Sequence, residues 1–326
     1  MREILTLAGE NLNSPMILSF VLGLSAAWVR SDLSFPEAIA KGMSLYLLFA
    51  IGFKGGVGVA AHGADARLVI ALLAGVVLSL VLPFLAFVLL RSLAQVSIID
   101  AAAVAGHYGS ISIVTFLTAS ALLTERGVPA ESYMVAIAAA MEAPAILSAL
   151  WLVAWRGEGV EKQSAKAWRE ILFNGSIVLL VGAFAIGWLT GQDGLAQIES
   201  FIVSPFKGIL CLFLLDMGLV AGRGLLSSRG ILKPGILVFA VLMPLTGATL
   251  GLVAGLALGL SQGGVTLMMV LCASASYIAA PAAMRVALPQ ANPGLSLTLS
   301  LGLTFPFNLI LGIPLYLAVT EFITKT

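Results

Sequence analysis

Charged residues are scarce in this chain. Asp, Glu, Lys and Arg make up only 10% of its 326 residues, whereas about a quarter of a soluble domain is charged. Apolar residues make up 60%, and the mean hydropathy is +1.07. A soluble protein of this composition would expose a large apolar surface to water, but in a bilayer apolar side chains can also face lipid. The composition and the long apolar runs therefore predict an all-α polytopic membrane protein.

Cysteine and histidine are also rare, which limits the available chemistry. Cys211 and Cys272 lie in apolar runs without CxxC spacing, which is typical of buried hydrophobic positions. His62 and His107 cannot form a zinc site alone, and no nucleotide-binding loop, metalloprotease or serine-hydrolase motif occurs. The net charge of +1 gives no attraction to nucleic acid. These absences argue against an ATP-driven pump and against an enzyme. Separately, Met1–Glu10 does not follow the pattern of a removable signal peptide.

Long apolar runs predict ten membrane-spanning helices, since one crossing takes about 20 mainly apolar residues. Loop signals separate the runs, such as Gly191–Gly194 between the sixth and the seventh. The expected spans are residues 14–30, 36–60, 67–92, 97–124, 131–156, 172–190, 202–223, 234–258, 264–288 and 295–322. They divide the chain into a first unit at 1–156, a polar connector at 157–171 and a second unit at 172–326.

Basic residues are unevenly distributed over the expected loops. With ten spans, the odd-numbered loops hold eleven of the 17 Lys and Arg residues, and the opposite side holds six. Cytoplasmic loops are enriched in basic residues. The distribution therefore predicts that the connector is cytoplasmic and that both termini lie outside.

The two halves of the chain share a pattern. Leu45–Gly56 in the second span parallels Leu212–Gly222 in the seventh, and Gly106–Ser112 in the fourth parallels Ser274–Pro281 in the ninth. Each half also ends in a span with a mid-helix proline. A repeat of five helices must be inverted in its second copy, and inverted repeats with interrupted helices are a transporter plan. Chance similarity between apolar helices is the alternative.

Small and hydroxyl-bearing residues gather at both interruptions. A broken helix in lipid frees backbone N–H and C=O groups, which are tolerated only beside protein, water or a ligand. Helix N-termini attract anions, and freed carbonyls and hydroxyls suit Na⁺. Helix packing is the alternative for any single small residue. The candidate substrate-binding residues are Gly109, Ser110, Ser112, Ser274, Ser276 and Tyr277.

Other polar residues within spans are candidates for cation binding or coupling, because ionisable groups are costly in a membrane. These candidates are Glu142 before Pro144, Asp216, His107 and Asn308. Each can instead be a structural hydrogen-bond partner, and Asn308 can satisfy backbone that Pro306 frees. Lys54 and Arg285 lie near span ends, where long basic side chains extend toward water.

Four segments resemble the sodium-dependent bicarbonate transporter family known from cyanobacteria. They are Ile51–Gly56, Met141–Ala145, Pro289–Pro293 and Gly312–Tyr316, and the similarity extends over nearly the whole chain. The resemblance implies two inverted five-helix repeats, a core domain that moves against a gate domain, and a homotrimer in the bacterial inner membrane. It also implies bicarbonate uptake with Na⁺ as the coupling ion, no other cofactor, and a PII-like cytoplasmic regulator as a partner. Tyr277 stands where cyanobacterial members have an aspartate.

The sequence therefore predicts a Na⁺-coupled importer of bicarbonate or a similar small anion. A Na⁺-coupled carrier of a different small carboxylate is an alternative. An anion channel on the same scaffold is another, although no dense ring of basic residues marks a pore. An intramembrane enzyme would need paired acids or a metal cluster, and the acids here are scattered.

Overall fold

A computed structural model of the chain describes residues 13–62, 66–142, 144–155, 175–227, 232–277, 280–281, 283–284 and 288–324. These residues form helices and connecting segments without a β-strand. Eight helices are long and apolar enough to cross a membrane, and two shorter apolar helices accompany them. Each of the ten expected spans overlaps one of these helices. In the part of the chain that the structure describes, the protein is thus an all-helical multi-pass membrane protein. The count of ten crossings stays a prediction. The connector at 157–171 lies outside the described residues.

Five of these helices run without a break in their helical backbone. They are α2 (Pro15–Trp28), α3 (Glu37–His62), α4 (Ala66–Leu93), α11 (Phe206–Ser227) and α12 (Pro234–Ala257). Ser14 caps α2, since its hydroxyl accepts a hydrogen bond from the Ile17 N–H at 3.3 Å. Interior prolines in α4 and α12 do not end these helices.

Helix α10 (Gly175–Ile202) differs from the sequence prediction. The Gly191–Gly194 segment was expected to form the loop between the sixth and seventh spans. Instead, the chain kinks at Gly191, whose φ of 57° lies in the left-handed region that glycine adopts without strain, and then resumes as a helix up to Ile202. The loop prediction was wrong because one glycine provides the whole change of direction.

Three spans are broken into shorter helices. The fourth consists of α5 (Ile98–Gly109) and α6 (Ile113–Glu125), the fifth of α7 (Met134–Ala140) and α8 (Pro144–Trp155), and the ninth begins as α13 (Gln262–Ala273). Ser110 and Ser274 follow α5 and α13 with extended backbone, and Ser112 caps α6. The prediction that the fifth span carries its proline in mid-helix was wrong, because proline disfavours helical geometry in the preceding residue and therefore begins a new helix here.

The last span shows the opposite behaviour around its proline. It is a continuous helical stretch of α15 (Pro293–Leu297), η1 (Thr298–Thr304), α16 (Phe305–Phe307), η2 (Asn308–Gly312) and α17 (Ile313–Thr324). The η1 and η2 segments are π-helical and flank Pro306 on both sides. Such wider turns let a helix continue past a proline that cannot donate a hydrogen bond.

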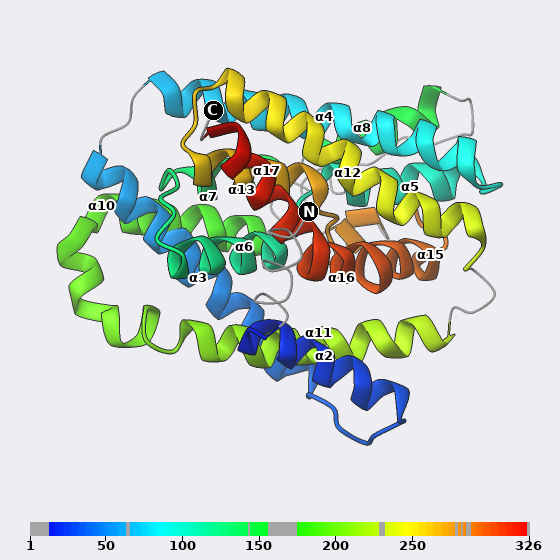
Figure 1. Cartoon of the computed structure of the whole chain (residues 1–326), viewed down its shortest axis with the longest axis horizontal. Helices are drawn as coiled ribbons and strands as arrows, with labels where there is room; N and C mark the ends of the chain where they lie inside the picture. Colours follow the sequence, from blue (N-terminus) through cyan, green and yellow to red (C-terminus); the bar gives the residue numbers. More distant parts are fainter. Residues whose placement is uncertain are drawn as a thin grey trace.

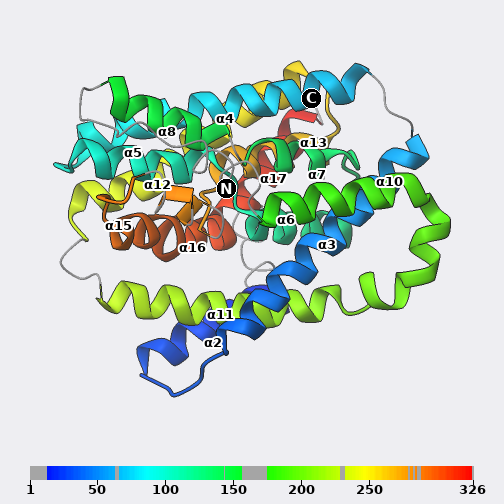
Figure 2. The same ribbon diagram turned by 180° about the vertical axis from the view of Figure 1, so that it is seen from behind.

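Four helices form a layer along one side of the molecule. Helices α2 and α11 pack together, α3 packs along α10, and α4 and α12 lie on the opposite side (Figure 1). Most of the broken helices lie between, whereas α8 lies beside α4, as the reverse view also shows (Figure 2). The α3–α10 pair and the α2–α11 pair each pack closely. A Cβ at Gly56 of α3 would overlap the Phe184 carbonyl of α10, and a Cβ at Gly218 of α11 would overlap the Phe20 carbonyl of α2. We call α2, α3, α10 and α11 the four-helix layer.

Two interhelical loops are anchored by carboxylates in the same manner. Glu131, in the loop before α7, accepts a hydrogen bond from the N–H of Ser261, the N-cap of α13, at 2.6 Å. Asp100, in the first turn of α5, accepts one at 2.7 Å from the N–H of Asn292, the N-cap of α15. Each bond ties a loop from one half of the chain to a broken helix of the other half.

Candidate functional site

The breaks in the fourth and ninth spans lie against each other. The Ser112 N–H donates to the Ser274 hydroxyl at 2.9 Å. The Ser276 N–H donates to the His107 carbonyl at 2.8 Å, and His107 Nδ1 donates to the Ser276 carbonyl at 2.7 Å. Three hydrogen bonds thus join segments that are more than 160 residues apart in the sequence. We call residues 110–112 and 274–277 the paired breaks.

The serines of the paired breaks complete helix ends that the breaks leave open. The Ser112 hydroxyl accepts from the Thr115 N–H at 3.3 Å and from the Thr115 hydroxyl at 2.9 Å. The Ser274 hydroxyl donates to the Leu271 carbonyl at 3.0 Å, and the Ser276 hydroxyl accepts from the Ala280 N–H at 3.2 Å. The N-terminus of α6, with the positive end of its dipole, therefore points into the paired breaks.

Three buried polar atoms near these breaks have no hydrogen-bond partner among the described residues. They are Ser110 Oγ, Glu142 Oε2 and the Tyr277 hydroxyl oxygen. The Tyr277 hydroxyl faces the Ser112 side chain without forming a regular hydrogen bond, and its ring packs edge-on against Phe305 at 5.0 Å. Most buried polar atoms in proteins are paired, so these three atoms are exceptions that leave hydrogen-bonding capacity unused.

Glu142 belongs to the break between α7 and α8, beside the paired breaks. A Cβ at Gly109 would lie 2.8 Å from Ala145, three residues after Glu142, so the end of α5 lies against the start of α8. The Glu142 side chain is only 5% exposed. At the same break, the Ser79 hydroxyl of α4 donates to the Met141 carbonyl at 2.5 Å. A carboxylate, hydroxyls and carbonyls suit a hard cation such as Na⁺.

Two other candidates have structural partners. His107 holds the paired breaks together through Ser276, as described above. The Asn308 amide donates to the Ala273 carbonyl at the end of α13 at 2.9 Å, and its oxygen accepts from the Tyr316 hydroxyl at 2.9 Å. Asn308 therefore satisfies backbone freed by the break in the ninth span rather than backbone freed by a proline.

Asp216 lies apart from the other candidates in the contacts of the described residues. It is buried in α11, which packs against α2. No hydrogen bond described for this part of the chain joins it to the paired breaks.

Sequence reasoning missed two hydroxyl contacts at the site. The Tyr108 hydroxyl lies 2.6 Å from the Thr304 hydroxyl, which donates to the Ala240 carbonyl at 2.9 Å. The second is the hydrogen bond from the Ser79 hydroxyl to the Met141 carbonyl. Ser79 is a lone hydroxyl residue within an apolar run, and this is the signal that could have identified it, whereas Thr304 is one of several hydroxyl residues in its span.

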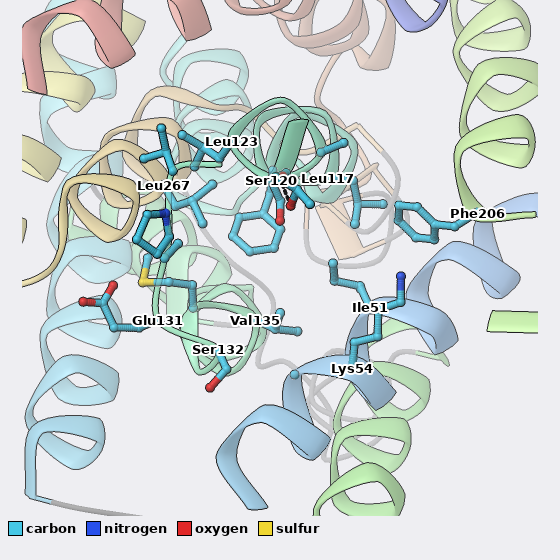
Figure 3. A pocket seen from close by; sticks show the side chains of 18 of the residues that line it. Ile51, Lys54, Leu117, Ser120, Leu123, Glu131, Ser132, Val135, Phe206 and Leu267 are labelled. Carbon is cyan, nitrogen blue, oxygen red and sulfur yellow. Dashed lines mark hydrogen bonds between the residues drawn. The ribbon is translucent and has the colours of Figure 1, made fainter. Parts of the chain in front are cut away.

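A cavity of 540 Å³ separates the four-helix layer from the broken helices (Figure 3). Its walls come from α3, α6, α7, α11 and α13, and from the loop between α6 and α7. Phe116 lines it one helical turn beyond Ser112. The part of α6 that lines the cavity therefore begins one helical turn from the paired breaks.

Interrupted apolar helices with buried polar atoms at the interruptions are typical of membrane transporters. The match to a family model makes this assignment specific. The chain belongs to the Na⁺-dependent bicarbonate transporter superfamily, whose model matches residues 15–321. No curated protein matches the chain at a significant level.

Proposed function

We propose that this protein takes up bicarbonate, or a similar small anion, together with Na⁺. The observation that carries the proposal is the set of three unpartnered polar atoms at adjoining helix breaks, on Ser110, Glu142 and Tyr277. The anion would bind at the N-terminus of α6, where N–H groups and the helix dipole favour negative charge. Hydroxyl groups of Ser110, Ser112 and Tyr277 would donate to it, and Na⁺ would bind beside Glu142.

An inverted five-helix repeat is part of this proposal. In such a repeat, the α3–α10 pair corresponds to the α11–α2 pair, and both are close crossings at glycine. The bond from Ser261 to Glu131 corresponds to the bond from Asn292 to Asp100. These matched contacts support two related units that divide near residues 157–171. A homotrimer, both termini outside and a PII-like regulator stay predictions of the sequence.

Uptake by purified protein in liposomes tests the proposal. We expect labelled bicarbonate to accumulate inside only when Na⁺ is higher outside, and accumulation to stop when the gradient is removed. Acetate and formate, tested as competitors, distinguish bicarbonate from another small carboxylate as the substrate. Continuous anion current without Na⁺ dependence would instead indicate a channel and would contradict the proposal.

A further inference from the structure

Lys54 places a positive charge on the wall of the cavity between the four-helix layer and α6. Its ammonium group lies 4.5 Å from the centre of the Phe206 ring, and both side chains line the cavity. In Figure 3, Lys54 and Phe206 lie on one wall, and Glu131 lies on the other with its carboxylate turned away. A lysine near a span end can extend to the water outside the protein, but this one extends toward an aromatic face inside the cavity.

The other charges on this cavity are engaged with partners of their own. Lys207 forms an ion pair with Glu125 at 2.7 Å. Glu131 accepts hydrogen bonds from the N–H and the hydroxyl of Ser261 at 2.6 and 3.1 Å. Among the described residues, no carboxylate is paired with Lys54. Its cation–π contact with Phe206 leaves the ammonium free to bind an anion as well.

The position of Lys54 suits an anion on its way to the paired breaks. Mostly apolar walls surround the charge, and such walls focus its field toward the interior of the cavity. Phe116, which lines the cavity, lies four residues from Ser112, which is about 6 Å along a helix. The loop between α6 and α7 borders the cavity, and the sequence predicts that this loop lies outside the cell.

We propose that Lys54 forms a capture site for small monovalent anions, which the protein holds there before they reach the paired breaks. This inference rests on the proposed function for the identity of the transported anion, but not for the binding itself. It assigns Lys54 to substrate affinity rather than to the transport step.

Substitution of Lys54 tests the capture site in the liposome uptake assay. For K54M we expect an increase in KM for bicarbonate of about tenfold, which corresponds to about 1.4 kcal/mol, with Vmax within about twofold of the wild type. K54R keeps the charge and should restore the wild-type KM. K207M is the matched control, because it removes an equal charge from the same cavity that is already paired with Glu125. An unchanged KM in K54M, or equal changes in K54M and K207M, would overturn the proposal.

A binding measurement on the wild-type protein separates this inference from the proposed function. A water-soluble amine-acetylating reagent modifies accessible lysines, and mass spectrometry then gives the rate for Lys54 and for Lys207. Bicarbonate, acetate or chloride should slow acetylation of Lys54 at least threefold relative to Lys207, even if the protein fails to transport bicarbonate. If none of the three anions protects Lys54, there is no capture site, whatever the uptake assay shows.

Discussion

Replacing Glu142 with Gln should weaken the response to Na⁺ without weakening the fold. The carboxylate is buried, and its Oε2 atom has no partner among the described residues. An unpaired buried charge costs several kcal/mol of desolvation, so its removal should leave the melting temperature unchanged or raise it. Two unit charges 4 Å apart attract by about 4 kcal/mol at an effective dielectric constant of about 20. If about half of this survives the desolvation of both ions, loss of the charge costs about 2 kcal/mol, or roughly thirtyfold in affinity for Na⁺.

The assay for E142Q is the Na⁺ concentration that gives half-maximal uptake, measured beside thermal unfolding in detergent. E131Q is the matched control, because the Glu131 carboxylate has a structural role at the N-cap of α13. We expect E131Q to lower the melting temperature and to leave the Na⁺ dependence unchanged, which is the reverse of E142Q. The reasoning is refuted if E142Q destabilises the protein while its half-maximal Na⁺ concentration stays at the wild-type value.

Three further substitutions, two of them with a comparison variant, test the site and the packing. Y277F should raise the KM for the anion about tenfold and leave the melting temperature unchanged, since the Tyr277 hydroxyl has no partner among the described residues. Y108F should instead lower the stability by about 1 kcal/mol, because it removes the hydrogen bond between the Tyr108 and Thr304 hydroxyls. H107A leaves the Ser276 carbonyl without its side-chain donor and should cost about 1–3 kcal/mol, measured as a lower melting temperature; an unchanged value would contradict the structural role. G218L should prevent the close crossing of α11 with α2 and abolish monodisperse protein on size exclusion, whereas G208L, which meets open space on the same helix, should behave as the wild type.

Sequence patterns predicted those parts of the fold that depend on composition. Long apolar runs identified the positions of the apolar helices, because a helix that crosses lipid must be mainly apolar. Clusters of Gly and Ser identified the breaks at Ser110 and Ser274, because such residues end helices and cap new ones. The family resemblance on four segments agrees with the family model that matches residues 15–321.

Local geometry near prolines and glycines could not be predicted in the same way. Pro144 begins a helix, whereas Pro306 is bridged by π-helical turns, and the two sequences carry no periodicity that distinguishes these outcomes. The roles of His107 and Asn308 were also beyond the sequence, because their partners lie on other helices. Whether a buried polar residue binds a ligand or a neighbour depends on tertiary contacts, which a single sequence does not contain.

The charges at the site lead to a prediction about stoichiometry. Among the described residues flanking the three breaks, Glu142 is the one carboxylic acid. With Glu142 ionised, the empty site carries one negative charge, and it carries the same charge after one Na⁺ and one bicarbonate bind. A site whose charge does not change avoids the large cost of moving additional charge through a low-dielectric region. We therefore expect that one Na⁺ is taken up with each anion and that this uptake generates no net current. The measurement is the accumulation of bicarbonate at equilibrium in liposomes whose membrane potential is set by a K⁺ gradient and valinomycin. An accumulation ratio that changes with an inside-positive or an inside-negative potential would show that this charge balance is wrong.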